Sequence, residues 1–324
     1  MFDIVGLGEL LIDFTPAGVS SAGNPQFQQN PGGAPPNVLA AAVRLGGKGA
    51  FIGMVGQDQF GYFLKDVLDK NAINAEGLGF TDKANTTLAF VHLKEDGDRD
   101  FSFYRNPGAD MMLSTDDVPY DIIDKSTIFH FGSLSMTADP SKTATLEAVK
   151  YAKAKGKIIS YDPNWRPPLW ESDAHAKEGM ELGLEYADII KVSEEELLFL
   201  TGEEDLEKGS KILMDKGIKL VVVTLGAEGC FICCNDGTVS MPTHKTNVVD
   251  TTGCGDAFMG TTLYFISQMK NSLQDITLDA MKKVVTYANA AGSLCATQKG
   301  GIPAMPTLQE VEALIESAPE FSLD

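Results

Sequence analysis

The chain has 324 residues, of which 44% are hydrophobic, and its 26 basic and 45 acidic residues give a formal net charge of −19. This length suffices for one large α/β domain or two small ones. The acidic excess argues against binding of nucleic acid or an anionic membrane surface. No apolar run approaches about 18 residues, and the first residues lack a basic segment. The sequence therefore predicts a cytoplasmic protein without a membrane span or a signal peptide.

The N-terminal segment begins with an apolar strand over residues 2–8, which ends in Gly6-Leu7-Gly8. A dinucleotide-binding fingerprint needs a third glycine where this chain has Leu11, so a dinucleotide-dependent oxidoreductase is disfavoured. Asp13 follows in a second apolar strand, where a carboxylate needs an internal partner or a cleft that binds hydroxyl groups. Residues 20–30 are polar and are expected to form a loop.

Two glycines, Gly32 and Gly33, precede an alanine-rich helix over residues 38–46, and Asn37 lies at its start. A glycine turn that enters a helix brings backbone N–H groups close to a ligand. Asn37 would then hold a hydroxyl group. The same residues also fit a tight turn in which Asn37 is only a local cap, and composition leaves both interpretations open.

Two β-like runs, over residues 86–93 and 99–104, interrupt the strand–helix alternation around them. The spacer Glu95-Asp96-Gly97-Asp98 predicts a hairpin between them. Together with the segment from about 11 to 30, these runs are interpreted as a small sheet that projects from the main domain as a lid. Arg105 follows the hairpin directly.

The rest of the chain alternates between strands and helices, which predicts a parallel sheet covered on both faces. Strands are expected over 50–56, 127–131, 157–161, 188–192 and 219–224, and helices over 60–70, 141–155, 174–186, 194–201, 205–216 and, as the last, 282–297. Ligands bind beyond the carboxyl ends of such strands. The polar residues at these ends are therefore expected to share one crevice: Asp13, Asp162 with Arg166, Lys191 with Glu194, and Thr224 with Gly226.

Five cysteines are present, and Cys230 and Cys233 have no second pair at metal-binding spacing. Their apolar neighbours predict a buried strand. Free thiols in the core, in a reducing compartment, are favoured over a metal or redox site.

Gly253-Cys254-Gly255-Asp256 precedes an apolar run, Ala257 to Ile266, that predicts a helix. Such a turn leaves backbone N–H groups unpaired, and the helix dipole adds positive potential, so an anion hole is expected. A carboxylate beside it repels phosphate, unless it serves to take a proton from an attacking hydroxyl group. The simpler alternative is a glycine turn with Asp256 as a helix cap.

Together these motifs resemble the ribokinase-like (PfkB) family of sugar kinases over nearly the whole chain. Gly32-Gly33-Ala34-x-x-Asn37 is similar to the first family signature, and Asp250-Thr-Thr-Gly-x-Gly-Asp256 to the second. Cys254 departs from the usual alanine, and Lys191 from an asparagine that many members carry. Both replacements are compatible with the family, because the hole uses backbone N–H groups and lysine is common in the fructokinase branch.

The segments around Tyr104-Arg105-Asn106-Pro107 and Asp162-Pro163-Asn164-Trp165-Arg166 look most like fructokinases. The related 2-keto-3-deoxygluconate kinases share both arginines. An arginine binds a carboxylate, a hydroxyl group or a phosphate. The arginines alone therefore leave the acceptor open between a ketose and a keto-acid.

The resemblance implies a single ribokinase-like domain over residues 1–324: a three-layer α/β/α sandwich with a mainly parallel sheet and a small projecting β-sheet lid. It implies ATP-dependent phosphorylation of a sugar hydroxymethyl group, most similar to fructose to fructose 6-phosphate, with Asp256 as the base and Gly253, Cys254 and Gly255 around the transferred phosphoryl group. The implied sugar contacts are Asp13, Gly32, Gly33, Asn37, Phe103, Arg105 and Arg166. The implied nucleotide contacts are Lys191, Glu194, Thr224, Gly226, Gly229, Asn289 and Ser293.

The resemblance also implies ions and an assembly. Glu194 would organise Mg²⁺ through water, and the carbonyl groups of Asp250 and Thr252 would hold a monovalent cation such as K⁺. A homodimer that forms through the lid is a further expectation. A P-loop kinase is excluded, because its signature occurs nowhere, and a catalytically inactive sugar sensor is disfavoured, because Asp256 and its glycines are present.

Overall fold

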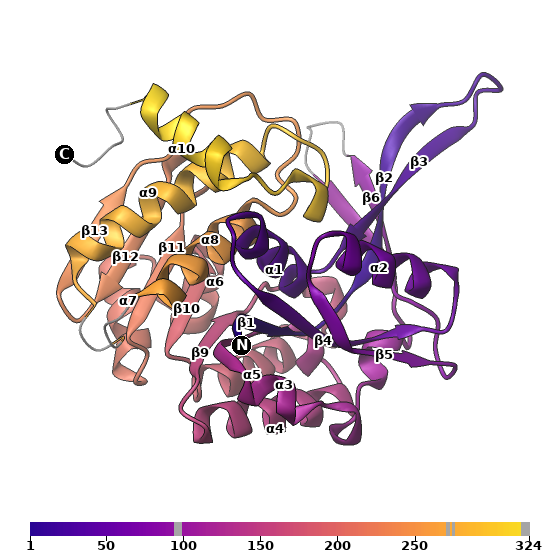
Figure 1. The fold of residues 1–324 in the computed structure, drawn as a ribbon, viewed down its shortest axis with the longest axis horizontal. Helices are drawn as coiled ribbons and strands as arrows, with labels where there is room; N and C mark the ends of the chain where they lie inside the picture. Colours follow the sequence, from indigo (N-terminus) through magenta and orange to yellow (C-terminus); the bar gives the residue numbers. More distant parts are fainter. Residues whose placement is uncertain (94–98, 270–272, 274–275, 319–324) are drawn as a thin grey trace.

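The computed structural model describes residues 1–93, 99–269, 273 and 276–318. Within these residues a nine-stranded sheet runs in the order β13-β12-β11-β10-β9-β8-β1-β4-β5, and a four-stranded sheet in the order β3-β2-β6-β7 (Figure 1). The large sheet is parallel from β5 to β11, and β12 and β13 extend it as antiparallel strands. The prediction of a mainly parallel central sheet with a small second sheet is confirmed.

The large sheet consists of β1 (Phe2–Leu7), β4 (Gly49–Gly56), β5 (Asn74–Thr81), β8 (Ser126–Gly132), β9 (Ile158–Asp162), β10 (Ile189–Ser193), β11 (Leu220–Thr224), β12 (Cys230–Cys234) and β13 (Gly237–Met241). The small sheet consists of β2 (Leu11–Val19), β3 (Pro25–Gly32), β6 (Leu88–Leu93) and β7 (Arg99–Tyr104). The expected turn over residues 95–98 lies outside the described residues.

The helices are α1 (Ala34–Arg44), α2 (Gln59–Lys70), α3 (Tyr120–Asp124), α4 (Ser141–Ala154), α5 (Asp173–Leu184), α6 (Glu194–Thr201), α7 (Leu206–Asp215), α8 (Cys254–Gln268), α9 (Leu278–Cys295) and α10 (Leu308–Ser317). None of the described helices is long and apolar enough to cross a membrane.

The large sheet separates two hydrophobic cores, because successive side chains of a strand point to opposite faces. In β1, Ile4 packs with α1, α2, α8 and α9, whereas Val5 and Leu7 pack with α3 to α7 on the other face. Phe51 and Ile52 of β4 divide in the same way. Both faces of the strands are therefore apolar and covered, and polar residues occur mainly where strands end.

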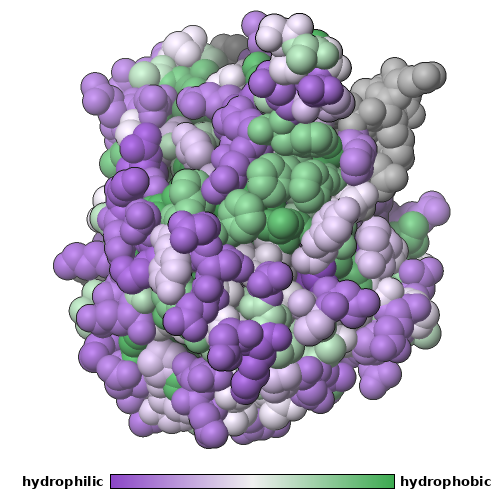
Figure 2. All heavy atoms as spheres, turned by 90° about the vertical axis from the view of Figure 1, so that its right-hand side faces the viewer, coloured by the Kyte–Doolittle hydropathy of each residue, from purple (hydrophilic) through white to green (hydrophobic). Residues whose placement is uncertain are grey.

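The small sheet also has two different faces. Asp13 and Phe103 are both aligned with Ala89 in neighbouring strands and face the cavity described below. Phe14 and Phe90, one residue further along their strands, stack on the opposite face with ring centroids 4.8 Å apart. Tyr104, which is 67% exposed, adds an edge-to-face contact with Phe90. Figure 2, which views this side of the molecule, shows a hydrophobic area surrounded by hydrophilic residues.

Two sequence predictions about single elements are wrong, and two strands were missed. The polar segment 20–30 is not only a loop, because β3 begins at Pro25. The helix α9 is not the last one, because α10 follows and begins at Thr307 with a capping box. The strands β5 and β13 were not predicted.

Candidate active site

The turn that opens α8 has the conformation that the sequence predicts for an anion hole. Gly253 adopts a left-handed conformation, with φ 80°, and α8 begins at the next residue. No side chain caps this helix end. A side chain at Gly253 would also press against Gly301, because its Cβ would lie 3.0 Å from the Gly301 Cα. Backbone N–H groups of the first turn therefore point out of the helix start, where a bound anion can accept hydrogen bonds from them.

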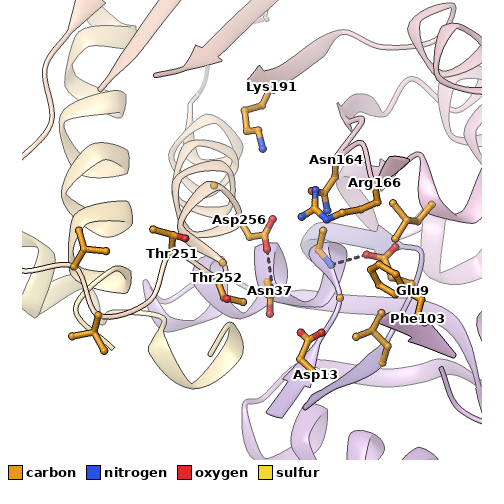
Figure 3. Close-up of a pocket in the computed structure, with 18 residues that line it drawn as sticks. Glu9, Asp13, Asn37, Phe103, Asn164, Arg166, Lys191, Thr251, Thr252 and Asp256 are labelled. Carbon is orange, nitrogen blue, oxygen red and sulfur yellow. Dashed lines mark hydrogen bonds between the residues drawn. The ribbon is translucent and has the colours of Figure 1, made fainter. Parts of the chain in front are cut away.

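Asp256 lies in that first turn and is the acidic residue within it. Removal from bulk water raises the pKa of its carboxyl group to about 6, although Lys191 opposes the rise. Asn37 Nδ2 donates a hydrogen bond of 2.8 Å to Asp256 Oδ2 (Figure 3). The carboxyl group is thus fixed in place and has a pKa close to neutrality, as a general base requires.

The hydrogen bond between Asn37 and Asp256 depends on close packing of α1 against α8. A Cβ on Gly260 would lie 2.7 Å from the Ala41 Cβ, so a larger residue would separate the two helices. Gly301 lies against the Asn37 side chain from the C-terminal segment, where a Cβ would approach Asn37 Nδ2 to 2.6 Å. The structure therefore favours the interpretation in which Asn37 belongs to a site, because its amide contacts another chain segment rather than capping its own helix.

These residues border a cavity of about 630 Å³. Its walls come from β2, β7, the start of α1, the segment that leads into α8 and the loops after the strands (Figure 3). The lining residues are Glu9, Leu11, Asp13, Gly33, Ala34, Asn37, Phe103, Leu134, Asn164, Arg166, Lys191, Val248, Val249, Thr251, Thr252, Gly253, Gly255 and Asp256. Of the residues expected to share a crevice at the carboxyl ends of the strands, Asp13, Arg166 and Lys191 line this cavity, whereas Asp162, Glu194, Thr224 and Gly226 do not.

One end of the cavity is acidic. Burial raises the pKa values of Glu9 and Asp13 to about 7, and Arg166 partly opposes this rise at Asp13. Glu9 Oε1 accepts a hydrogen bond of 2.7 Å from the Ala34 backbone N–H, which holds the start of α1. Gly32 lies against the Asp13 carboxylate, whose Cγ would be 2.8 Å from a Cβ at this position. A side chain at position 32 would therefore displace the Asp13 carboxylate.

Basic groups lie on the opposite wall. Lys191, at 7% exposure, forms an ion pair with Asp162 in which Nζ and Oδ2 are 2.7 Å apart. Burial alone would lower the pKa of Lys191, but Asp162, Glu196 and Asp256 together raise it, so the lysine stays charged. Arg166 donates one hydrogen bond of 3.0 Å to its neighbour's carbonyl group, and its charge acts on Asp13 and Asp256 across the cavity.

Arg105 does not line the cavity, so the expectation that it points into the crevice is not met. Its Nη2 lies 2.7 Å from Asp110 Oδ2 in a buried ion pair. Nη1 donates to Thr137 Oγ1 at 2.9 Å, and Nη2 also donates to the Leu134 carbonyl group at 2.8 Å. The nearby carboxylate and carbonyl groups outcompete a ligand for these donors, because an unpaired buried guanidinium group would be unstable.

The residues expected to bind the nucleotide also lie outside the lining, with the exception of Lys191. Glu194 is exposed at the first position of α6, and Gly226 and Gly229 flank the turn between β11 and β12 with φ values of 56° and 101°. Thr224 Oγ1 donates to the Val192 carbonyl group at 3.3 Å. Asn289 and Ser293 lie on α9, where their side chains donate to the carbonyl groups of Pro242 and His244 at 2.9 Å and 3.2 Å.

Asp250 and Thr252 form the loop that leads into α8. The Asp250 carboxylate accepts hydrogen bonds from the backbone N–H groups of Thr252 at 2.7 Å and of Gly300 at 3.1 Å. The carbonyl oxygens of Asp250 and Thr252 were expected to hold a cation. The Asp250 carbonyl oxygen accepts a hydrogen bond from the Cys254 thiol at 3.9 Å, and the Thr252 carbonyl oxygen accepts one from the Cys295 thiol at 3.6 Å. All five cysteines are free; four are buried, and Cys254 is half-buried.

Sequence reasoning missed Glu9, Asn164, Thr251 and the two valines Val248 and Val249 in the cavity wall. Glu9 follows the end of β1, so the rule that ligands bind beyond strand ends was sufficient to find it. The valines are 62% and 53% exposed and carry no chemical signal in the sequence.

Comparison with known proteins identifies relatives over almost the entire chain. A family profile described as "pfkB family carbohydrate kinase" matches residues 1–308. Probable fructokinase-5 of Arabidopsis thaliana is 46% identical over 318 residues, which cover 97% of either chain. A crystal structure of fructokinase with bound ATP from Xylella fastidiosa is 34% identical, has a TM-score of 0.91 and covers 98% of this chain and 100% of its own. A double-mutant fructokinase from Vibrio cholerae O395 in its fructose-, ADP- and potassium-bound form is also 34% identical, with a TM-score of 0.88 and coverage of 96% and 97%.

Proposed function

The chain belongs to the pfkB family of carbohydrate kinases, and we propose that it transfers the γ-phosphoryl group of ATP to the 6-hydroxymethyl group of D-fructose. The names of the relatives reported above support fructose as the acceptor. Independent support comes from the charges around the cavity, which favour a neutral acceptor over a keto-acid.

The acidic end of the cavity is the observation that carries this choice. Glu9 and Asp13 both face the space beside Phe103. A neutral ketose donates hydroxyl hydrogens to such carboxyl groups, whereas the carboxylate of a keto-acid would be repelled by them. Arg105, one of the two arginines expected to bind such a carboxylate, is neutralised by Asp110. Arg166 is the other arginine that could bind the carboxylate of a keto-acid. Its positive charge already interacts with the carboxyl groups of Asp13 and Asp256 on the facing wall.

In the proposed reaction, Asp256 accepts the proton of the attacking hydroxyl group as its oxygen bonds to the γ-phosphorus. Asn37 keeps the carboxylate oriented through their 2.8 Å hydrogen bond. The N–H groups of Gly253 and Gly255 at the start of α8 stabilise the negative charge that develops on the transferred phosphoryl group, and the Cys254 N–H, which donates to the Thr251 carbonyl group at 3.3 Å, lies between them. Lys191 supplies positive charge from the opposite wall.

The sugar is proposed to contact Asp13, Asn37 and Arg166, with Gly32 and Gly33 allowing close approach and Phe103 closing the side. ATP would approach from the loop between β11 and β12, with Thr224, Gly226, Gly229, Asn289 and Ser293 around its base and ribose. Among the described residues, no group of three or more His, Cys, Asp or Glu side chains is arranged to hold a metal ion. Mg²⁺ keeps several waters, and it would be held chiefly by phosphate oxygens and water, with Glu194 as an outer partner. K⁺ would contact the carbonyl groups of Asp250 and Thr252.

The small sheet is proposed to act as a lid that closes over the sugar and excludes water. Its face away from the cavity carries Phe14, Phe90 and the exposed Tyr104. Exposed apolar faces commonly bind another protein surface. We therefore propose a homodimer in which a second copy covers this face, to be tested by the sedimentation of wild type against Tyr104→Asp.

The decisive experiment compares kcat/KM for D-fructose and 2-keto-3-deoxygluconate with saturating MgATP. We expect a preference for fructose of at least about tenfold, since one misplaced buried charge costs more than 1.4 kcal/mol. A tenfold preference for the keto-acid would overturn the acceptor assignment but leave the kinase assignment intact. Absence of phosphoryl transfer to either compound would contradict both.

A further inference from the structure

Two of the five cysteines border the turn that opens α8. Cys254 is the first residue of α8, and Cys295 is the last residue of α9, which packs against α8 (Figure 1). The Cys295 thiol donates to the Thr252 carbonyl group at 3.6 Å, and the Cys254 thiol donates to the Asp250 carbonyl group at 3.9 Å. A Cβ on Gly253 would lie 3.7 Å from Cys295 Sγ. Both thiols therefore lie against the same four-residue segment.

The packing of α8 against α9 holds the two cysteines close to each other. A Cβ on Gly292, three residues before Cys295 on α9, would lie 3.3 Å from the carbonyl oxygen of Cys254. The other three cysteines belong to β12 and are buried in that strand. Cys254 and Cys295 therefore form a pair at the ends of α8 and α9, separate from the three cysteines of β12.

Exposure distinguishes the roles of the two sulfurs. Cys254 is half-buried beside the cavity, whereas Cys295 is 0% exposed. A reagent in solution therefore meets Cys254 first. Cys295 can then react only with a sulfur that is already at its side, which is the arrangement of an attacking thiol and a resolving thiol.

We propose that Cys254 and Cys295 are a dithiol that a small-molecule disulfide oxidises to an intramolecular disulfide, which inactivates the kinase. The Cys254 thiolate attacks one sulfur of oxidised glutathione and releases one glutathione. The Cys295 thiolate then attacks Cys254 Sγ and releases the second glutathione. The two thiol protons are taken up by the two released thiolates, so two protein thiols are oxidised and one small disulfide is reduced.

Inactivation follows from the position of Cys254. A covalent S–S bond holds two sulfurs closer than any non-bonded contact, so the first turn of α8 must shift toward α9. That turn carries the N–H groups of the anion hole and, two residues after Cys254, Asp256. The new bond also removes the S–H groups that the carbonyl oxygens of Asp250 and Thr252 now accept.

The test uses the full-length protein, incubated with oxidised glutathione, alkylated and digested without reduction. Mass spectrometry is expected to find the peptides of Cys254 and Cys295 joined, while fructose phosphorylation falls at least about tenfold and dithiothreitol restores both. Cys295→Ala should keep its basal activity and resist inactivation. Cys233→Ala, a matched loss of a buried thiol in β12, should be inactivated like the wild type.

Three results would overturn the proposal: glutathione attached to Cys254 without a cross-link, equal inactivation of Cys295→Ala, or a cross-link that leaves activity unchanged. If Cys295→Ala does not fold, Cys295→Ser retains a donor for the Thr252 carbonyl group and serves in its place. The wild-type mass spectrum is decisive for the cross-link in either case. Because the cross-link is read without an acceptor, its absence is distinguishable from a wrong assignment of fructose.

Discussion

Replacing Asp256 with asparagine keeps the size of the side chain and removes its capacity to take a proton. The new amide oxygen can still accept the hydrogen bond that Asn37 Nδ2 now donates at 2.8 Å. Loss of a positioned general base lowers the rate by roughly 10²–10⁴, or about 3–5 kcal/mol of activation free energy. We expect kcat to fall by this factor, while KM for ATP changes by less than about threefold, because the substitution leaves ground-state binding in place.

The pH dependence of the wild-type enzyme gives a second measure of the same group. The pKa of Asp256 is raised to about 6, mainly by burial. The ionised form is the base, so activity is lost as pH falls through this value. With that pKa, about 97% of the carboxyl groups are ionised at pH 7.5 and about 9% at pH 5, so kcat should fall about tenfold between them. The residual activity of Asp256→Asn should lack this step.

The assay is direct quantification of ADP by chromatography, which avoids coupling enzymes that have their own pH dependence. Asp116→Asn provides a matched control, because this exposed carboxylate lies away from the cavity. The control should retain wild-type kcat at every pH. A kcat of Asp256→Asn within about threefold of the wild type would refute the assignment of the base.

Three further predictions concern the acidic end of the cavity and the lid. Gly32→Ala should raise KM for fructose at least about tenfold, because its Cβ displaces the Asp13 carboxylate, and KM for ATP measured in the same initial-rate experiment should stay unchanged. Burial raises the pKa of Glu9 to about 7, so the folded state holds its proton more tightly and loses about 3 kcal/mol of stability as pH rises from 4 to 8. Glu9→Gln should remove most of that loss in urea unfolding curves, and equal slopes against pH for both proteins would contradict this. Fructose should slow hydrogen exchange of backbone amides in β6 and β7, and equal exchange with and without the sugar would count against a lid.

The order of strands and helices could be predicted from the sequence, because buried strands and amphipathic helices leave local patterns. The turn at Gly253 could also be predicted, because glycine adopts the left-handed conformation readily and here directly precedes an apolar helical run. Strand β3 could not, because residues 25–29 are exposed and include three glutamines and a proline, with Phe27 as the one large apolar side chain. Its pairing with β2 is set by long-range contacts rather than by its own composition.

The role of Arg105 could not be predicted for a different reason. Its hydrogen-bond partners are Asp110, Thr137 and Leu134, which lie up to 32 residues away in the sequence. No local sequence pattern predicts that these residues surround one arginine. A charged side chain in a sequence is equally suited to a ligand and to the protein. The packing around the side chain decides whether it binds a ligand or another residue of the protein. Here Arg105 forms an ion pair with the buried carboxylate of Asp110.

The hydrogen bond between Asn37 and Asp256 joins residues that are 219 positions apart, which has a consequence for synthesis on the ribosome. At about 5–20 residues per second, roughly 10–40 s pass between the emergence of α1 and that of α8. Throughout this interval the apolar face of α1, including Val38 and Ala41, has no partner from α8 to cover it. Nascent chains that stop before α8 therefore present this helix to chaperones, and phosphoryl transfer begins only when the C-terminal part of the polypeptide has been made.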